Sequence, residues 1–226
     1  MFCKAFFFIR YRCSRFSLQT TFFLLLLISP VAAQALSLDV TVQGVKGEEQ
    51  KNIMASLKIT RQKDNPDLTA RHIRRMHKAA PEEIAEALAP FGYYSVEVKD
   101  GGSLTKDKTG WHAVYQVIPG PPVLVDRISI EVAGPGKDEK FFGSLEQQFP
   151  LKKGEQLRDT LYEQGKKNIL ATALSNGYIR AGFSESSVLV HKKEHRAEIK
   201  LRLATGSLFF FGRTTSVQDI IMPDTL

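Results

Sequence analysis

The chain has 226 residues, of which 43% are hydrophobic and 24% are charged, with a formal net charge of +7 at pH 7. This balance is typical of a globular protein and excludes a disordered chain, a collagen-like chain and a polytopic membrane protein. The two cysteines, Cys3 and Cys13, both lie near the N-terminus. The rest of the chain can therefore form no disulfide, no cysteine zinc site and no thiol nucleophile.

The first 35 residues predict a cleaved secretory leader. Basic residues precede the apolar run FFLLLLI (Phe22–Ile28), and SPVAAQA supplies the small residues of a cleavage site, after Ala35 or Ala33. An uncleaved anchor is the alternative, because Phe16–Leu36 spans 21 positions and a membrane helix needs roughly 20 residues. Pro30 and the two adjacent cleavage sites favour removal.

Removing this leader lowers the net charge. The leader holds four of the 31 basic residues and none of the 24 acidic ones, so the mature chain has 27 basic residues and a net charge of about +3. The densest basic stretch, RHIRRMHK (Arg71–Lys78), has no interleaved aromatic residues and no groove-reading motif. We therefore expect no nucleic-acid partner and interpret this stretch as a solvated helix face.

The first structural segments after the leader are a strand and two helices. Leu36–Gly44 alternates apolar and polar residues and stops at a glycine, as a half-buried strand does. Helical patterns follow in Glu48–Leu57 and in a longer segment that ends at Phe91. Pro81 is expected at the first position of the helix that carries the last apolar stripe, with acidic residues after it.

A glycine-tyrosine turn and a hairpin complete this unit. Gly92 is expected to end the helix in the left-handed conformation, and Tyr93 to fold back on the apolar stripe. Val96 and Val98 then alternate before the polar turn KDGGSLTKDKTG, and Trp111–Val117 alternates on the way back.

The same order recurs further along the chain. Ile128–Gly134 predicts a strand, Glu139–Gln148 and Arg158–Ser175 predict helices, and a second turn follows at Gly177 and Tyr178. The two glycines of these turns lie 85 positions apart. The stretch SSVLV, the charged turn HKKEH and the alternation of IKLRL predict the second hairpin. The fold class is therefore α+β, with two tandem β-α-α-β-β units.

A third copy begins near the end of the chain. Pro119–Arg127 and Thr205–Arg213 align at an offset of 86, and each links a last strand to the next first strand. We divide the chain into a leader (1–35), two units (36–119 and 120–205) and the truncated start of a third (206–226).

No residue pattern indicates an enzyme. His191 and His195 have a metal-binding spacing only on a helix, and they flank an expected turn instead. Glu82 and Glu86 could pair as acid and base, but surface charge explains them more simply. There is no G-x-S-x-G elbow and no phosphate-binding glycine loop. We expect no catalytic residue, no metal site and no cofactor.

These residues resemble a known family. The repeated unit with GYY and GYI after its second helix is similar to the POTRA (polypeptide-transport-associated) domain. The stretches ALAPFGYYSVEV, YQVIPGPPVLVDRISIEVAG and ALSNGYIRAGF resemble the N-terminal region of the TamA family, over nearly the whole mature chain. The resemblance implies two helices on a three-stranded mixed sheet in each unit.

The resemblance also implies a cellular role. TamA-family proteins carry three such domains on the periplasmic side of an outer-membrane β-barrel that helps to insert or export other proteins. The implied partners are an inner-membrane-anchored subunit of the same module and unfolded outer-membrane protein substrates. This chain departs from the pattern because it ends within the third domain and has no barrel, so it cannot insert proteins by itself.

The implied strand order 1-3-2 leaves the second strand of each sheet at an edge. Such an edge can bind another extended chain through backbone hydrogen bonds, and it therefore tolerates many sequences in the bound chain. The candidate edges are Ser95–Val98 and Ser186–Val190. The side chains that we assign to them are Val96, Val98, Ser186, Val188 and Val190, although the valines could equally be plain core residues.

Two other functions are open at this point. One is a division-type protein whose POTRA domain hangs from a retained anchor in the inner membrane. The other is a soluble periplasmic binding module of two domains, complete at Leu226. Sequencing the mature N-terminus would show whether the anchor of the division-type protein is retained. Reading the DNA beyond the last codon would show whether the chain is a complete two-domain module.

Overall fold

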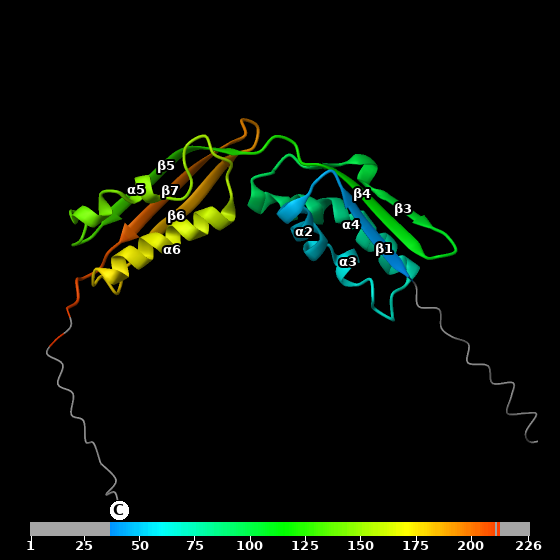
Figure 1. The fold of residues 1–226 in the computed structure, drawn as a ribbon, viewed down its shortest axis with the longest axis horizontal. Helices are drawn as coiled ribbons and strands as arrows, with labels where there is room; N and C mark the ends of the chain where they lie inside the picture. Colours follow the sequence, from blue (N-terminus) through cyan, green and yellow to red (C-terminus); the bar gives the residue numbers. More distant parts are fainter. Residues whose placement is uncertain (1–36, 211, 213–226) are drawn as a thin grey trace, which may run out of the picture. The chain divides into compact units, whose positions relative to one another are not determined.

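The computed structural model describes residues 37–210 and 212 (Figure 1). Two units of helices and sheet, 38–118 and 124–204, follow one another along the chain. The predicted leader lies outside the described residues, as does most of the predicted start of a third unit. None of the described helices is both long and apolar enough to cross a membrane.

The first unit is built around a central strand, β4. Its elements in chain order are β1 (Leu38–Gln43), α2 (Gly47–Ser56), α3 (Lys58–Arg61), α4 (Ala70–Leu88), η2 (Ala89–Phe91), β2 (Glu97–Val98), η3 (Lys99–Gly101), β3 (Ser103–Lys106) and β4 (Trp111–Ile118). Strand β1 pairs with β4 in parallel, and β2 and β3 pair with it antiparallel. The apolar side chains of β4 and the helices form the core: Ile53, Ile59, Ile73, Ile84, Leu88, Trp111, Ala113, Tyr115 and Val117.

The edge strand of this sheet is split. Four residues, Lys99–Gly102, stand between β2 and β3 opposite only two residues of β4, Tyr115 and Gln116. Asp100 has a φ of 53°, so the backbone turns out of the sheet here. The prediction of one long turn from Lys99 to Gly110 was wrong, because Ser103–Lys106 pairs with β4. The side chains of Ser103–Lys106 are mostly exposed, and this segment lacks the alternation of apolar and polar residues that indicates a strand.

Helix α4 begins eleven residues earlier than Pro81, at Ala70. The side chain of Thr69 caps it by accepting a hydrogen bond from the N–H of His72 at 3.3 Å. The expectation that Pro81 is the first residue of a helix was wrong, since Pro81 lies inside α4. A proline there removes the bond to the carbonyl of His77. The stripe of buried residues on both sides of Pro81, including Ile73 and Ile84, stabilises the longer helix through tertiary packing.

The second unit repeats this plan around β7. Its elements are β5 (Leu124–Ala133), η4 (Lys140–Phe142), α5 (Leu145–Gln148), α6 (Asp159–Ser175), β6 (Gly182–His191) and β7 (Arg196–Ala204). Strand β5 is parallel to β7, and β6 is antiparallel to it, in the order β5-β7-β6. The first predicted helix, Glu139–Gln148, is two short pieces. The predicted α+β class, with helices on mixed sheets, is confirmed.

A half-buried histidine, His77, and a buried tyrosine, Tyr115, connect α4 to the sheet of the first unit. His77 Nδ1 lies 3.0 Å from the hydroxyl of Tyr115, whose side chain is fully buried. Burial lowers the pKa of His77 below its ordinary value of 6.5. Burial first, and then the charge of Glu83, raises the pKa of Tyr115. The pair is therefore neutral near pH 7.

This pair makes stability depend on pH. We expect the free energy of unfolding to fall as the pH is lowered from about 7, because His77 takes up a proton in the unfolded state before it does so in the folded state. The variant His77→Gln, which keeps a polar group near Tyr115, should flatten this part of the profile. Urea unfolding at a series of pH values measures it. An identical slope in both proteins would show that another group titrates.

Candidate functional site

Strand β6 forms one edge of the second sheet. It pairs with β7 on one side, and no described strand pairs with its other side. The pairing is regular over seven consecutive residues, Glu185–His191. Their outward N–H and C=O groups offer hydrogen bonds to another extended chain. The predicted edge Ser186–Val190 lies wholly within this stretch.

The side chains of β6 alternate between the core and solvent. Val188 and Val190 pack against the hydrophobic core of the second unit. The hydroxyl of Ser186 lies 2.8 Å from that of Tyr162 on α6. Leu189 points the other way and is 58% exposed. The valines that sequence analysis assigned to binding thus also serve the core, and what β6 offers to a partner is its backbone.

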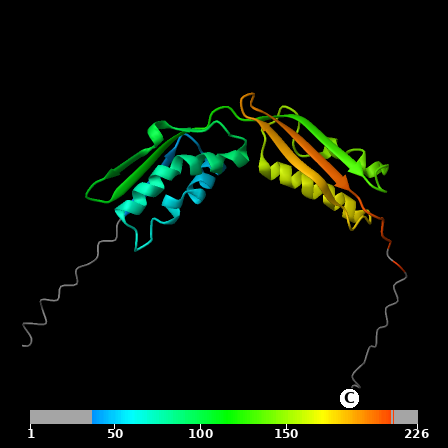
Figure 2. The same cartoon turned by 180° about the vertical axis from the view of Figure 1, so that it is seen from behind.

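A groove of about 390 Å³ runs between β6 and α6, which lies along the sheet in both views (Figures 1 and 2). It is lined by Asp159, Tyr162, Glu163, Lys166, Ser186 and Val188. Lys166 Nζ lies 3.0 Å from Glu163 Oε1 and forms an ion pair with it. Burial, and then the charge of Glu163, raises the pKa of Asp159. A chain added to β6 would place alternate side chains in this groove, which sequence analysis did not foresee.

The predicted edge of the first unit is shorter. Only Glu97 and Val98 of Ser95–Val98 lie in a strand. Val98 is buried and Val96 packs partly against the core. The four residues of the split then interrupt the edge before β3. Irregularities of this kind protect an edge from pairing with other chains.

The two glycine-tyrosine turns have the same geometry. Gly92 has a φ of 81° and Gly177 a φ of 88°, the left-handed region that favours glycine. The N–H of Tyr93 donates to the carbonyl of Leu88 at 3.3 Å, and that of Tyr178 donates to the carbonyl of Ala173 at 3.0 Å. These bonds, together with those of the glycine N–H groups, are the Schellman motif that ends a helix.

Each turn also binds the segment that leaves its unit. The carbonyl of Gly92 accepts a hydrogen bond from the N–H of Val123 at 2.8 Å. The carbonyl of Gly177 accepts one from the N–H of Phe209 at 2.9 Å. Val123 and Phe209 are 86 positions apart, so the chain leaves both units in the same way.

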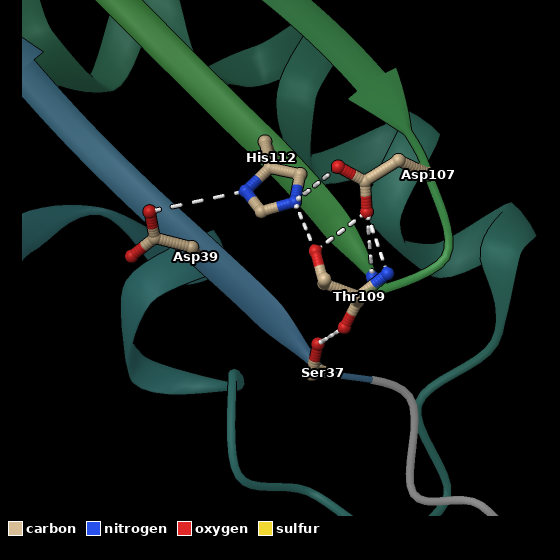
Figure 3. A network of polar contacts seen from close by, with 6 residues as sticks. Ser37, Asp39, Asp107, Thr109 and His112 are labelled. Atoms are coloured by element: carbon tan, nitrogen blue, oxygen red, sulfur yellow. Dashed lines mark hydrogen bonds and ion pairs between the residues drawn. The ribbon is translucent and has the colours of Figure 1, made fainter.

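A polar network at the β3–β4 turn has the residue types of a catalytic triad (Figure 3). His112 Nε2 lies 3.0 Å from Thr109 Oγ1, and its Nδ1 lies 4.0 Å from Asp39. Thr109 Oγ1, however, is 2.6 Å from a carboxylate oxygen of Asp107, which also accepts hydrogen bonds from the N–H groups of Thr109 and Gly110. The carboxylate takes the hydroxyl proton that a catalytic base would need.

This network therefore holds the turn together. The hydrogen bonds from Thr109, first, lower the pKa of Asp107, whose side chain is 58% exposed. The hydroxyl of Ser37 donates to the carbonyl of Thr109 and so connects the chain just before β1 to the turn. No local sequence pattern indicates this network, because Asp39 and His112 come together only through the parallel pairing of β1 with β4.

The histidines considered for a metal site lie in the second unit, and the glutamates considered for catalysis lie in the first. His191 is the last residue of β6, and His195 lies in the following turn with a φ of 50°. Glu82 and Glu86 are exposed on α4. Within 37–210 and 212, no group of three or more His, Cys, Asp or Glu side chains is arranged to hold a metal ion.

Comparisons with known proteins found a family model and several solved structures. Residues 39–119 match the family described as POTRA domain, TamA domain 1. Among solved structures, the chain is similar to POTRA domains 3–5 of BamA from Haemophilus influenzae, with 16% identity over 81% of this chain and 73% of that one, and a TM-score of 0.41. The first two POTRA domains of the periplasmic domain of Omp85 from Anabaena match with 17% identity over 77% and 96%, and a TM-score of 0.33.

A third solved structure matches over a smaller share of its own length. BamA from Haemophilus ducreyi lacking POTRA domains 1–3 matches with 15% identity over 75% of this chain, at a TM-score of 0.38. The match covers 29% of that protein.

Proposed function

We propose, from the premise that residues 39–119 are a POTRA domain of the TamA type, that this chain is the periplasmic docking module of an outer-membrane protein assembly or translocation factor. The leader would be residues 1–35, the POTRA domains 36–119 and 120–205, and the start of a third domain 206–226. The repeated exit from each unit, at Val123 and at Phe209, supports this division.

The partners in this proposal are protein chains. They are unfolded outer-membrane proteins on their way to the membrane and an inner-membrane-anchored subunit of the same module. The chain itself would be held at the outer membrane by the barrel that follows the POTRA domains in this family. The role is binding and not catalysis.

The observation that carries the docking mechanism is the regular edge of β6 beside its groove. An incoming strand would pair with Glu185–His191 through backbone hydrogen bonds, each contributing about 0.5–1.5 kcal/mol. Backbone pairing accepts many sequences, which suits a module that receives varied unfolded chains. Alternate side chains of the incoming strand would enter the groove next to Tyr162 and Asp159.

Proline substitution tests this edge. Neighbouring residues of an antiparallel strand direct their N–H groups to opposite sides, so one of Ser186→Pro and Ser187→Pro leaves the pairing with β7 intact. We expect that variant to stay folded by circular dichroism. It should bind a fluorescent peptide copied from a membrane β-strand at least about tenfold more weakly in fluorescence anisotropy.

The matched control is Lys106→Pro on β3, the edge strand of the first unit, because Asp107 pairs with Gly110 and the N–H of Lys106 therefore faces away from β4. It removes an N–H from an edge in the same way and should leave peptide binding unchanged. Full binding by the folded β6 variant, or an equal loss in the control, would contradict docking on β6.

A further inference from the structure

The outward face of the first half of α4 is a basic surface. Five basic side chains, and no acidic one, line a hollow of about 570 Å³: Arg71, His72, Arg74, Arg75 and Lys78. Within the described part of the chain, none of the three arginines or the lysine takes part in an ion pair. We call these five residues the α4 basic face.

The concentration of charge is local. Residues 36–119 contain twelve basic and eleven acidic side chains, so the first unit as a whole is nearly neutral. The first turn of α4 holds no acidic residue. A basic side chain in the first turn of a helix, such as Arg71, opposes the helix dipole. An anionic partner would offset this unfavourable arrangement.

The surroundings of the basic face indicate the shape of that partner. A second hollow of about 520 Å³ shares His72 and Arg75 with the first. Leu68, Met76 and Ala79 are its apolar lining, and Lys58, Gln62, Asn65 and Glu83 complete it. Arg74 is held in place because its guanidinium lies 5.6 Å from the ring centre of Trp111. The surface is thus a hollow with a basic rim and an apolar wall.

We propose that the α4 basic face docks an acidic segment of a partner protein that carries apolar side chains between its carboxylates. The arginines would bind the carboxylates, and the apolar wall would take the intervening side chains. A lipid surface fits less well, because none of the exposed large hydrophobic side chains of the described residues lies on α4 or in the loop before it. This surface is separate from β6 and acts through side chains.

The test uses a fluorescent peptide of glutamates with interspersed leucines, and a second peptide with glutamine at every glutamate. We expect the chain to bind the acidic peptide in fluorescence anisotropy, and binding to weaken with added salt. The triple variant Arg71→Gln, Arg75→Gln, Lys78→Gln should bind it at least about tenfold more weakly. Arg74 is kept because of its contact with Trp111.

The matched control removes three exposed lysines of the second unit, Lys137→Gln, Lys140→Gln and Lys193→Gln, with the same change in charge. It should bind as the unchanged protein does. The triple variant should melt no lower than the unchanged protein, because all three side chains are exposed and the charge of Arg71 opposes the helix dipole, so unfolding cannot cause its loss of binding. Equal loss in the control, equal binding of the glutamine peptide, or binding only to phosphatidylglycerol vesicles would overturn the proposal.

Discussion

Replacing Gly165 with alanine is expected to lower the free energy of unfolding of the second unit by about 2 kcal/mol, although alanine is the better helix former. Gly165 lies on the buried side of α6. An added Cβ atom would stand 2.2 Å from Cε2 of Phe149, a side chain that is 2% exposed. The cost of displacing this packed ring exceeds the gain in helix propensity of about 0.5–1 kcal/mol.

Urea unfolding with and without a second substitution separates the clash from other causes. Shortening the ring in Gly165→Ala, Phe149→Leu should cost less than the sum of the two single changes, since the leucine leaves room for the new methyl group. Gly182→Ala is the control, because nothing lies within 4 Å of its added Cβ atom. Additive effects in the double variant would show that Phe149 does not explain the cost. Because α6 lines the groove beside β6, Gly165→Ala should also weaken strand binding.

The second large effect is expected at Glu83. The variant Glu83→Ala should lower the free energy of unfolding of the first unit by about 1.5–3 kcal/mol. The carboxylate is 8% exposed, and its Oε2 accepts a hydrogen bond from the backbone N–H of Lys58, the first residue of α3, at 2.9 Å. Lys58 Nζ lies 3.1 Å from Oε1, but that ammonium is largely exposed and contributes little.

The neighbouring residue supplies the control for this prediction. Glu82 is exposed on the same helix, and Glu82→Ala should change stability by less than about 0.5 kcal/mol. Glu83→Gln should fall between the two, because the amide oxygen still accepts the bond without the charge. Thermal and urea unfolding measure the stability of all three variants. Similar losses of stability in Glu83→Ala and Glu82→Ala would show that the hydrogen bond from Lys58 to Glu83 does not stabilise the first unit.

Several features could be predicted because they depend on neighbours in the chain. The turn at Gly92 and the turn at Gly177 each follow an apolar stripe, and a helix can end there only in a left-handed conformation that glycine adopts. The strands β1, β4, β5 and β7 alternate visibly because one side of each faces a core. The position of β6 at an edge followed from the family order 1-3-2, and the structure has this order.

Other features depend on residues far apart in the chain. The length of α4 was missed because Pro81 is locally unfavourable and only packing of the whole stripe keeps it helical. The partner of Glu83 is 25 positions away, and the groove exists only where α6 meets β6.

The sequence alone thus determined the repeated plan of the chain, because hydrophobic period and helix stops act over a few residues. The tertiary structure decided which edge is regular, which carboxylate is buried and which basic side chains share one face. Those properties depend on contacts between distant segments, and no local pattern in the sequence encodes them.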